Sequence, residues 1–152
     1  MAENTTVDIK SVDWILRIAM CGEFLGHGIL AVMQKKKFVD MFVGMGALIG
    51  LTISSTAAGQ WVFWIGLLDV IVAIAILFKP LRIILIWGIF WAFMTAIARP
   101  LASPDGWNIF ATILDANKDN FWDFIERFAN IGVPLALLYI RGLPKTVKDL
   151  FE

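Results

Sequence analysis

The chain has 152 residues, of which 59% are hydrophobic and only 17% are charged, and its formal net charge is zero. This balance is far more apolar than that of a soluble domain, and it offers neither a basic face for nucleic acid nor an acidic tail for basic partners. Cys21 is the only cysteine, so an intramolecular disulfide, a C-x-x-C redox pair and a thiolate zinc cage are excluded by counting. We expect one domain, residues 1–152, embedded in a lipid bilayer.

Four stretches are apolar and close to the length of about 20 residues that a membrane-spanning helix needs. They are residues 14–33, 61–78, 81–98 and 121–140. The second and third are joined through Lys79-Pro80, which predicts a tight antiparallel hairpin because proline cannot continue the preceding helix. The sequence therefore predicts an all-α, integral membrane four-helix bundle.

The stretch between the first and second spans, residues 35–60, is apolar at first but rich in Gly, Ser and Thr, and it runs on toward Trp61 without a clear turn. Its most apolar part is residues 38–53. Because a fifth span here would leave no room for a loop, we expect an interfacial or re-entrant segment between helices 1 and 2. Four spans place both termini on the same side. A small excess of Lys and Arg on that side favours cytoplasmic termini, and we expect the bacterial inner membrane.

Several ionisable side chains lie inside the predicted spans, where a charge costs about 2.5–3.5 kcal/mol on insertion scales and marks a paired or functional position. Antiparallel threading brings seven of them into the same half of the bundle: Glu23, His27, Asp69, Arg99, Asp123, Glu126 and Arg127. Two interpretations remain open. These groups pair with one another and hold the helices together, or they form a pocket for a cationic ligand, a metal ion or the polar head of a quinone.

The acidic stretch before the fourth span has the spacing of an EF-hand calcium loop. The residues at its liganding positions are Asp115, Asn117, Asp119, Asp123 and Glu126. Asn120 stands where the loop needs glycine, and the chain contains no second copy with which such a loop could pair. The alternative is that these acids cap the fourth helix and lie in its first turn, where the helix dipole favours them. We favour this alternative over calcium.

Short motifs in all four predicted spans resemble one family. The first span contains WILRIAMCGEFLGHG, the second GLLDVIVAIAILFKPLR, the third ends in ARPLA and the last contains FIERFANIGVPLALL. In these segments, over about residues 14–140, the chain resembles the DoxX-like family of small four-helix membrane proteins. The resemblance implies cytoplasmic termini and a buried polar site among the helices. Some members of that family look like membrane subunits of quinone-linked oxidoreductases, and others look like assembly factors or cargo receptors.

Our leading hypothesis is an accessory or assembly subunit without catalytic activity of its own. It would bind a membrane protein partner, a second copy of itself or a lipid-like ligand around the buried polar residues. One alternative is a quinone-binding membrane subunit of an oxidoreductase, with quinone as its cofactor. The other is a proton or cation pathway along Glu23, Asp69 and Glu126.

Overall fold

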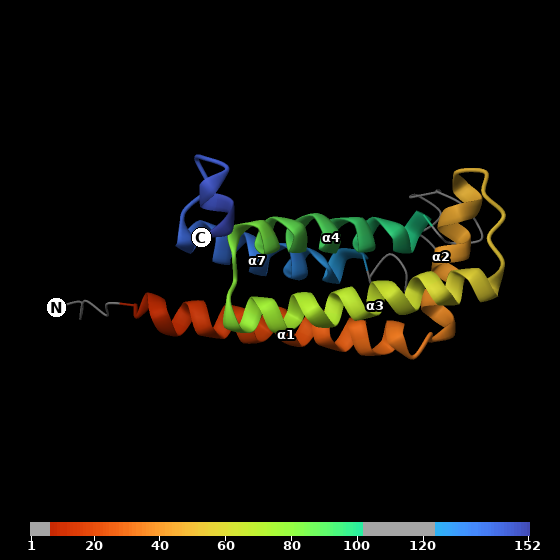
Figure 1. The fold of residues 1–152 in the computed structure, drawn as a ribbon, viewed down its shortest axis with the longest axis horizontal. Helices are drawn as coiled ribbons and strands as arrows, with labels where there is room; N and C mark the ends of the chain where they lie inside the picture. Colours follow the sequence, from red (N-terminus) through yellow and green to blue (C-terminus); the bar gives the residue numbers. More distant parts are fainter. Residues whose placement is uncertain (1–6, 102–123) are drawn as a thin grey trace.

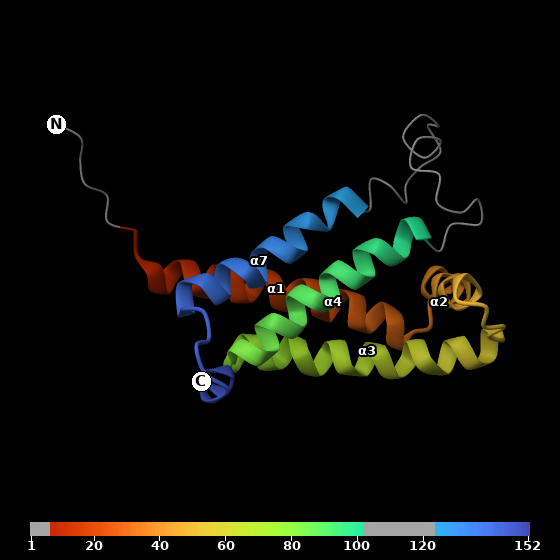
Figure 2. The ribbon, with the colours of Figure 1, turned by 90° about the horizontal axis from the view of Figure 1, so that it is seen from above.

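The computed structural model describes residues 7–101 and 124–152, and in these residues the regular structure is entirely helical. Its elements are α1 (Ile9–Val32), α2 (Lys36–Leu48), α3 (Ser55–Phe78), α4 (Arg82–Leu101), α7 (Phe128–Arg141) and a 3₁₀ helix, η1 (Lys148–Phe151). In Figure 1, α1 and α3 lie side by side as one layer, and α4 and α7 lie above them. Figure 2 shows that α4 and α7 cross this lower layer obliquely.

Three helices, α1, α3 and α4, are long and apolar enough to cross a membrane, by their length and composition. Their outward faces carry large apolar side chains with no covering protein, such as Ile18 on α1 and Trp64 and Ile71 on α3, each at least 60% exposed. Such a surface suits contact with lipid. The helical class and three helices suited to a membrane are thus confirmed for the described part of the chain.

Two of these helices begin earlier than predicted. α1 begins at Ile9 rather than at residue 14, because the Asp8 carboxylate accepts hydrogen bonds from the Lys10 amide (3.1 Å) and the Ser11 hydroxyl (2.7 Å). α3 begins at Ser55 rather than at residue 61, where the Ser54 hydroxyl accepts from the amide of Ala57 (3.2 Å). These N-caps satisfy amides that hydropathy does not consider.

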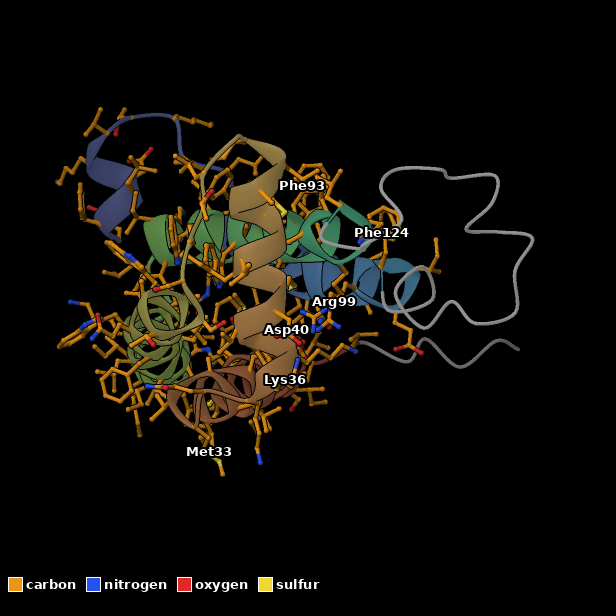
Figure 3. All side chains as sticks on the ribbon, turned by 90° about the vertical axis from the view of Figure 1, so that its right-hand side faces the viewer. Met33, Lys36, Asp40, Phe93, Arg99 and Phe124 are labelled. Atoms are coloured by element: carbon orange, nitrogen blue, oxygen red, sulfur yellow. The ribbon has the colours of Figure 1, made fainter. Side chains whose placement is uncertain are left out.

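The segment predicted to be interfacial or re-entrant contains a helix, α2, which follows a turn at Gln34. The backbone φ of Gln34, before α2, is +51°. After α2 the chain turns back toward α3 through Gly50, whose φ is +76°. α2 packs against both α3 and α4. Seen from that end of the molecule in Figure 3, it crosses from α1 toward α4, with Lys36 and Asp40 near its start.

The fourth predicted span, residues 121–140, overlaps α7. Residues 124–126 are helical, and the backbone turns at Arg127 before α7 begins, while residues 121–123 lie outside the described residues. α7 packs against α4 and α1. As predicted for Lys79-Pro80, α3 ends at Phe78 and α4 begins at Arg82. The two helices do not pair closely as a hairpin, because α4 crosses α3 obliquely and packs mainly against α7 (Figure 2).

α1 and α3 approach each other closely at two glycines. A Cβ atom on Gly66 would lie 2.6 Å from the amide nitrogen of Val32 and 2.7 Å from the carbonyl oxygen of Gly28. A Cβ atom on Gly28 would meet the Gly66 carbonyl oxygen at 2.9 Å. Because these neighbours are backbone atoms, they cannot move aside cheaply, and the two glycines set the spacing of the helices.

The core lies where the two layers meet. Met20 and Phe24 of α1, Val72 and Ile76 of α3, and Leu85 of α4 pack together there with buried leucines of α7. The start of α1 lies at the same end of the molecule as η1, which is the end away from α2 (Figure 1).

Arginines tie the helices together at the end of the molecule opposite α2. Asp13 pairs with Arg17 (2.5 Å) and with Arg141 (2.9 Å), which joins α1 to the end of α7. Arg82 donates to the carbonyl oxygens of Arg141 (2.6 Å), Gly142 (2.7 Å) and Asp149 (3.1 Å). Asp149 in turn accepts from the backbone amides of residues 145 and 146 (2.8 and 2.9 Å). The segment after α7 is thereby held against the start of α4.

The close approach of α1 and α3 predicts opposite effects of alanine at two glycines. Gly66→Ala should lower the free energy of unfolding by about 1–3 kcal/mol, because the added methyl group meets backbone atoms. Gly22→Ala should raise it by up to about 1 kcal/mol, because nothing lies within 4 Å of a Cβ atom there and alanine favours the helix. Unfolding of the detergent-purified variants measures both, and equal effects would contradict this packing.

The Asp149 carboxylate predicts a pH dependence of the segment after α7. The Lys145 amide and the hydroxyl and amide of Thr146 lower the pKa of Asp149 below its ordinary value of 3.8. Its contribution to stability is therefore complete above pH 3.8 and is lost as the pH falls through the lowered pKa. Hydrogen exchange at the amides of Lys145 and Thr146, corrected for its intrinsic pH dependence, should accelerate in that range. Asp149→Asn should show the same loss of protection already at neutral pH, and unchanged protection in both cases would refute this role.

Candidate functional site

A polar cluster joins α1 to α7 and consists of Glu23, His27, Arg127 and Asn130. The Asn130 side-chain amide donates to Glu23 Oε1, and the Arg127 guanidinium lies 3.8 Å from the same oxygen. Arg127 also makes a hydrogen bond to His27 Nε2. His27 Nδ1 lies 3.0 Å from Glu23 Oε1 and 2.9 Å from the Glu23 backbone oxygen. We call these four residues the α1–α7 cluster.

The contacts of His27 define which of its ring nitrogens carries a proton. A guanidinium can only donate hydrogen bonds, so His27 Nε2 accepts from Arg127 and holds no proton. Nδ1 then carries the proton and donates hydrogen bonds to the side-chain and backbone oxygens of Glu23. In this arrangement the imidazole is neutral, and Glu23 and Arg127 supply the opposite charges of the cluster.

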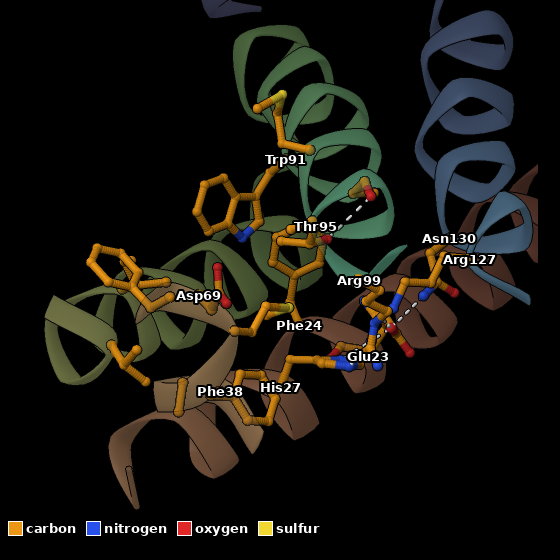
Figure 4. A pocket seen from close by; sticks show the side chains of 18 of the residues that line it. Glu23, Phe24, His27, Phe38, Asp69, Trp91, Thr95, Arg99, Arg127 and Asn130 are labelled. Atoms are coloured by element: carbon orange, nitrogen blue, oxygen red, sulfur yellow. Dashed lines mark hydrogen bonds and ion pairs between the residues drawn. The ribbon is translucent and has the colours of Figure 1, made fainter. Parts of the chain in front are cut away.

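The structure brings together only some of the seven predicted residues. Glu23, His27 and Arg127 are in contact. Arg99, in the last turn of α4, lines with them the two cavities that are described below. Glu126 is exposed and lines only the smaller of those cavities, while Asp123 lies outside the described residues. Asp69 stands apart from the others on α3 (Figure 4). The predicted gathering is thus a tight cluster with one separate carboxyl group.

A cavity of about 250 Å³ lies beside the α1–α7 cluster. Its walls come from five helices, and apart from the cluster, Arg99 and Asp69, they are largely apolar or aromatic. α2 supplies Phe38, Met41, Phe42 and Met45. Phe38 also packs edge-on against the His27 ring, with centroids 6.1 Å apart. α2 therefore closes one side of the cavity with flexible and aromatic side chains.

The opposite walls come from α3 and α4. α3 contributes Val62, Ile65 and Asp69, and α4 contributes Trp91 and Thr95. In Figure 4 the indole nitrogen of Trp91 points toward Asp69, and the Thr95 hydroxyl donates to the backbone oxygen of its own helix (3.1 Å). The cavity is thus apolar in its middle and has polar groups at two separate places.

A second cavity, of about 220 Å³, is lined, among the described residues, by polar side chains. Glu23, His27, Arg99, Arg127 and Asn130 line both cavities, and Glu126 is added here. The α1–α7 cluster thus has one face toward an apolar space and another toward a polar one. This is an arrangement in which an amphipathic molecule could be oriented.

The calcium hypothesis is not tested by the structure. Asp115, Asn117, Asp119 and Asp123 all lie outside the described residues, and Glu126 is the one remaining member. Within residues 7–101 and 124–152, no three His, Cys, Asp or Glu side chains come close enough to hold a metal ion.

The sequence analysis missed the contribution of α2 to this site, although a signal was present. Phe38, Met41, Phe42 and Met45 recur at offsets of three, four and seven residues, which places them on one face of a helix. Asn130 is not among the predicted site residues either. An amide that donates to the carboxylate of another helix cannot be recognised before that helix is placed.

No family model, curated protein or solved structure matches the chain. The resemblance to the DoxX-like family therefore stays a prediction, and function has to be argued from the geometry of the site.

The cluster predicts an unequal cost of removing two carboxylates. Glu23→Ala should lower the free energy of unfolding by about 1–3 kcal/mol, because Arg127 and Asn130, both partly buried, lose their shared acceptor. Asp40→Ala is the control, since its ion pair with Lys36 (2.5 Å) is exposed and should contribute less than about 1 kcal/mol. Equal losses in unfolding experiments on the purified variants would show that the cluster does not hold α1 to α7.

Proposed function

We propose that this protein is a non-catalytic accessory protein of the membrane that binds a small, lipid-like, amphipathic molecule in the large cavity. The observation that carries this proposal is the lining of the cavity. Its middle is formed by side chains such as Met41, Met45 and Ile65, while its ionisable side chains, among the described residues, belong to the α1–α7 cluster, Arg99 and Asp69. Ligand sites typically have this composition, with few polar groups on apolar walls.

The volume of the cavity supports a ligand of modest size. A dry apolar cavity of about 150 Å³ is already sufficient to bind benzene. At about 250 Å³, this cavity has room for two fused rings or a short branched chain. Methionines adapt their shape to different ligands more easily than branched side chains do, and three of them, Met41, Met45 and Met94, line it.

The state of the cluster supports binding rather than catalysis. Glu23, His27, Arg127 and Asn130 already satisfy one another, and His27 uses both ring nitrogens in doing so. A general base or a proton carrier needs a nitrogen or oxygen that can reach a substrate. The cluster is therefore better suited to fixing α1 and α7 as walls of the cavity than to moving protons. A quinone would occupy the same cavity. The identity of the bound molecule therefore distinguishes the accessory protein from a quinone-binding subunit of an oxidoreductase.

The membrane setting is part of the proposal. α7 together with the residues before it serves as the fourth span, α2 lies as an interfacial or re-entrant helix, and the start of α1 and η1 face the cytoplasm of a bacterium. The slight excess of Lys and Arg at the end that holds η1 supports this orientation. A four-helix protein of the DoxX-like type, with a membrane protein partner, would have this arrangement.

Filling the cavity should remove the bound molecule. Ala98→Phe places an aromatic ring at the cavity wall, whereas Ala19→Phe adds the same ring to an exposed position of α1 outside it. After gentle extraction, mass spectrometry of the intact protein should detect a bound small molecule in the wild type and in Ala19→Phe. Its occupancy should fall by at least about tenfold in Ala98→Phe, as expected when a ligand loses its space.

The same measurement separates the alternatives. A quinone among the extracted molecules would favour the redox subunit. A wild-type protein that carries no small molecule in native membranes, and none after incubation with membrane lipids, would refute the proposed function.

A further inference from the structure

Asp69 is the one charged residue among the described residues that is buried, with 5% of its surface exposed. It lies near the middle of α3 and lines the large cavity. Its Oδ1 atom has no hydrogen-bond partner in the part of the chain that the structure describes. Buried polar atoms in native proteins are nearly always paired, and an ionisable residue at this depth of a membrane helix marks a functional position.

Asp69 lines the cavity, and few polar groups approach its carboxyl group. The indole of Trp91 approaches the carboxyl group from α4, as Figure 4 shows. Its neighbours along the cavity face of α3 are apolar, namely Ile65 and Val62. Among the described residues no Lys or Arg side chain forms an ion pair with it. The opposite polar end, at the α1–α7 cluster, consists of groups that are already bonded to one another.

We propose that Asp69 selects the ligand by pairing its carboxyl group with a hydroxyl group, so that the cavity takes a neutral apolar alcohol or phenol. This inference rests on the proposed function, because it names the class of molecule that the same cavity binds. The apolar body of the ligand lies against Met41 and Met45 of α2, and its hydroxyl group points to α3.

A hydroxyl group fits this position better than the other common polar groups. It donates to a carboxylate and accepts from a carboxylic acid, so it pairs with Asp69 in either protonation state. A carbonyl group, as in a quinone, has only lone pairs and would leave a carboxylate without a donor. An ammonium group would have to leave water for a cavity whose middle is apolar, with a single carboxyl group to compensate it.

Three probes with the same ring system test the inference: 2-naphthol, 2-methoxynaphthalene and 2-naphthylmethylamine. Their binding to the full-length protein in lipid nanodiscs is measured by equilibrium dialysis, with empty nanodiscs subtracted. The wild type should bind 2-naphthol at least about tenfold more tightly than 2-methoxynaphthalene, which can accept a hydrogen bond but cannot donate one. It should also prefer 2-naphthol to the amine.

Two substitutions at Asp69 and one matched control complete the test. Asp69→Leu should bind 2-naphthol and 2-methoxynaphthalene equally, whereas Asp69→Asn should keep part of the preference, because an amide both donates and accepts. Asp40→Leu removes an exposed carboxylate that does not line the cavity and should keep the full preference.

The possible failures are distinguishable. If the wild type binds none of the three probes, or binds them unchanged in Ala98→Phe, the cavity is not the binding site and the proposed function fails. If the wild type and Asp69→Leu each bind 2-naphthol and 2-methoxynaphthalene equally tightly, the cavity binds ligands but the proposed role of Asp69 is wrong. Tighter binding of the amine than of 2-naphthol would show that the cavity prefers a cation to an alcohol, and would overturn the inference.

Discussion

The carboxylate of Glu23 is the acceptor on which the arrangement of this molecule depends. It receives the side-chain amide of Asn130, which lies 107 residues further along the chain, and it faces the guanidinium of Arg127. A partly buried acid on a long apolar helix is tolerable only with partners, and those partners lie on α7 and in the turn before it. The requirement to satisfy this charge favours the packing of α7 against α1, and with it the place where the cavity between the layers forms.

Steric contacts fix the spacing of α1 and α3, whereas polar contacts hold α7 against α1. Contact between glycines brings α1 and α3 so near that no side chain separates them, and this leaves the bulky residues of α3 to point elsewhere. The cavity lies on the other side of that contact, where α2 crosses from one layer to the other. Its apolar lining therefore follows from helices that cannot close the remaining space themselves, because their spacing is fixed at other points.

Much of this could be predicted from the sequence, for identifiable reasons. Apolar stretches of sufficient length gave three of the helices, Lys79-Pro80 gave the break between α3 and α4, and the four-residue spacing of Glu23 and His27 put them on one face. The starts of α1 and α3 could not be placed, because hydropathy is blind to capping by Asp8 and Ser54. The separation of Asp69 from the cluster depends on how α3 is rotated about its axis. Backbone contact at Gly66 decides that rotation, and no pattern within α3 reveals it.

The three carbonyl oxygens held by Arg82 have a consequence for the order of assembly. Arg82 lies at the start of α4, yet its acceptors belong to residues 141, 142 and 149. During synthesis, when chains fold from the N-terminal side, α3 and α4 are made well before those acceptors exist. Until then the guanidinium lacks these three acceptors. The position of α4 is thus provisional, and it becomes locked in place when the segment after α7 emerges from the ribosome.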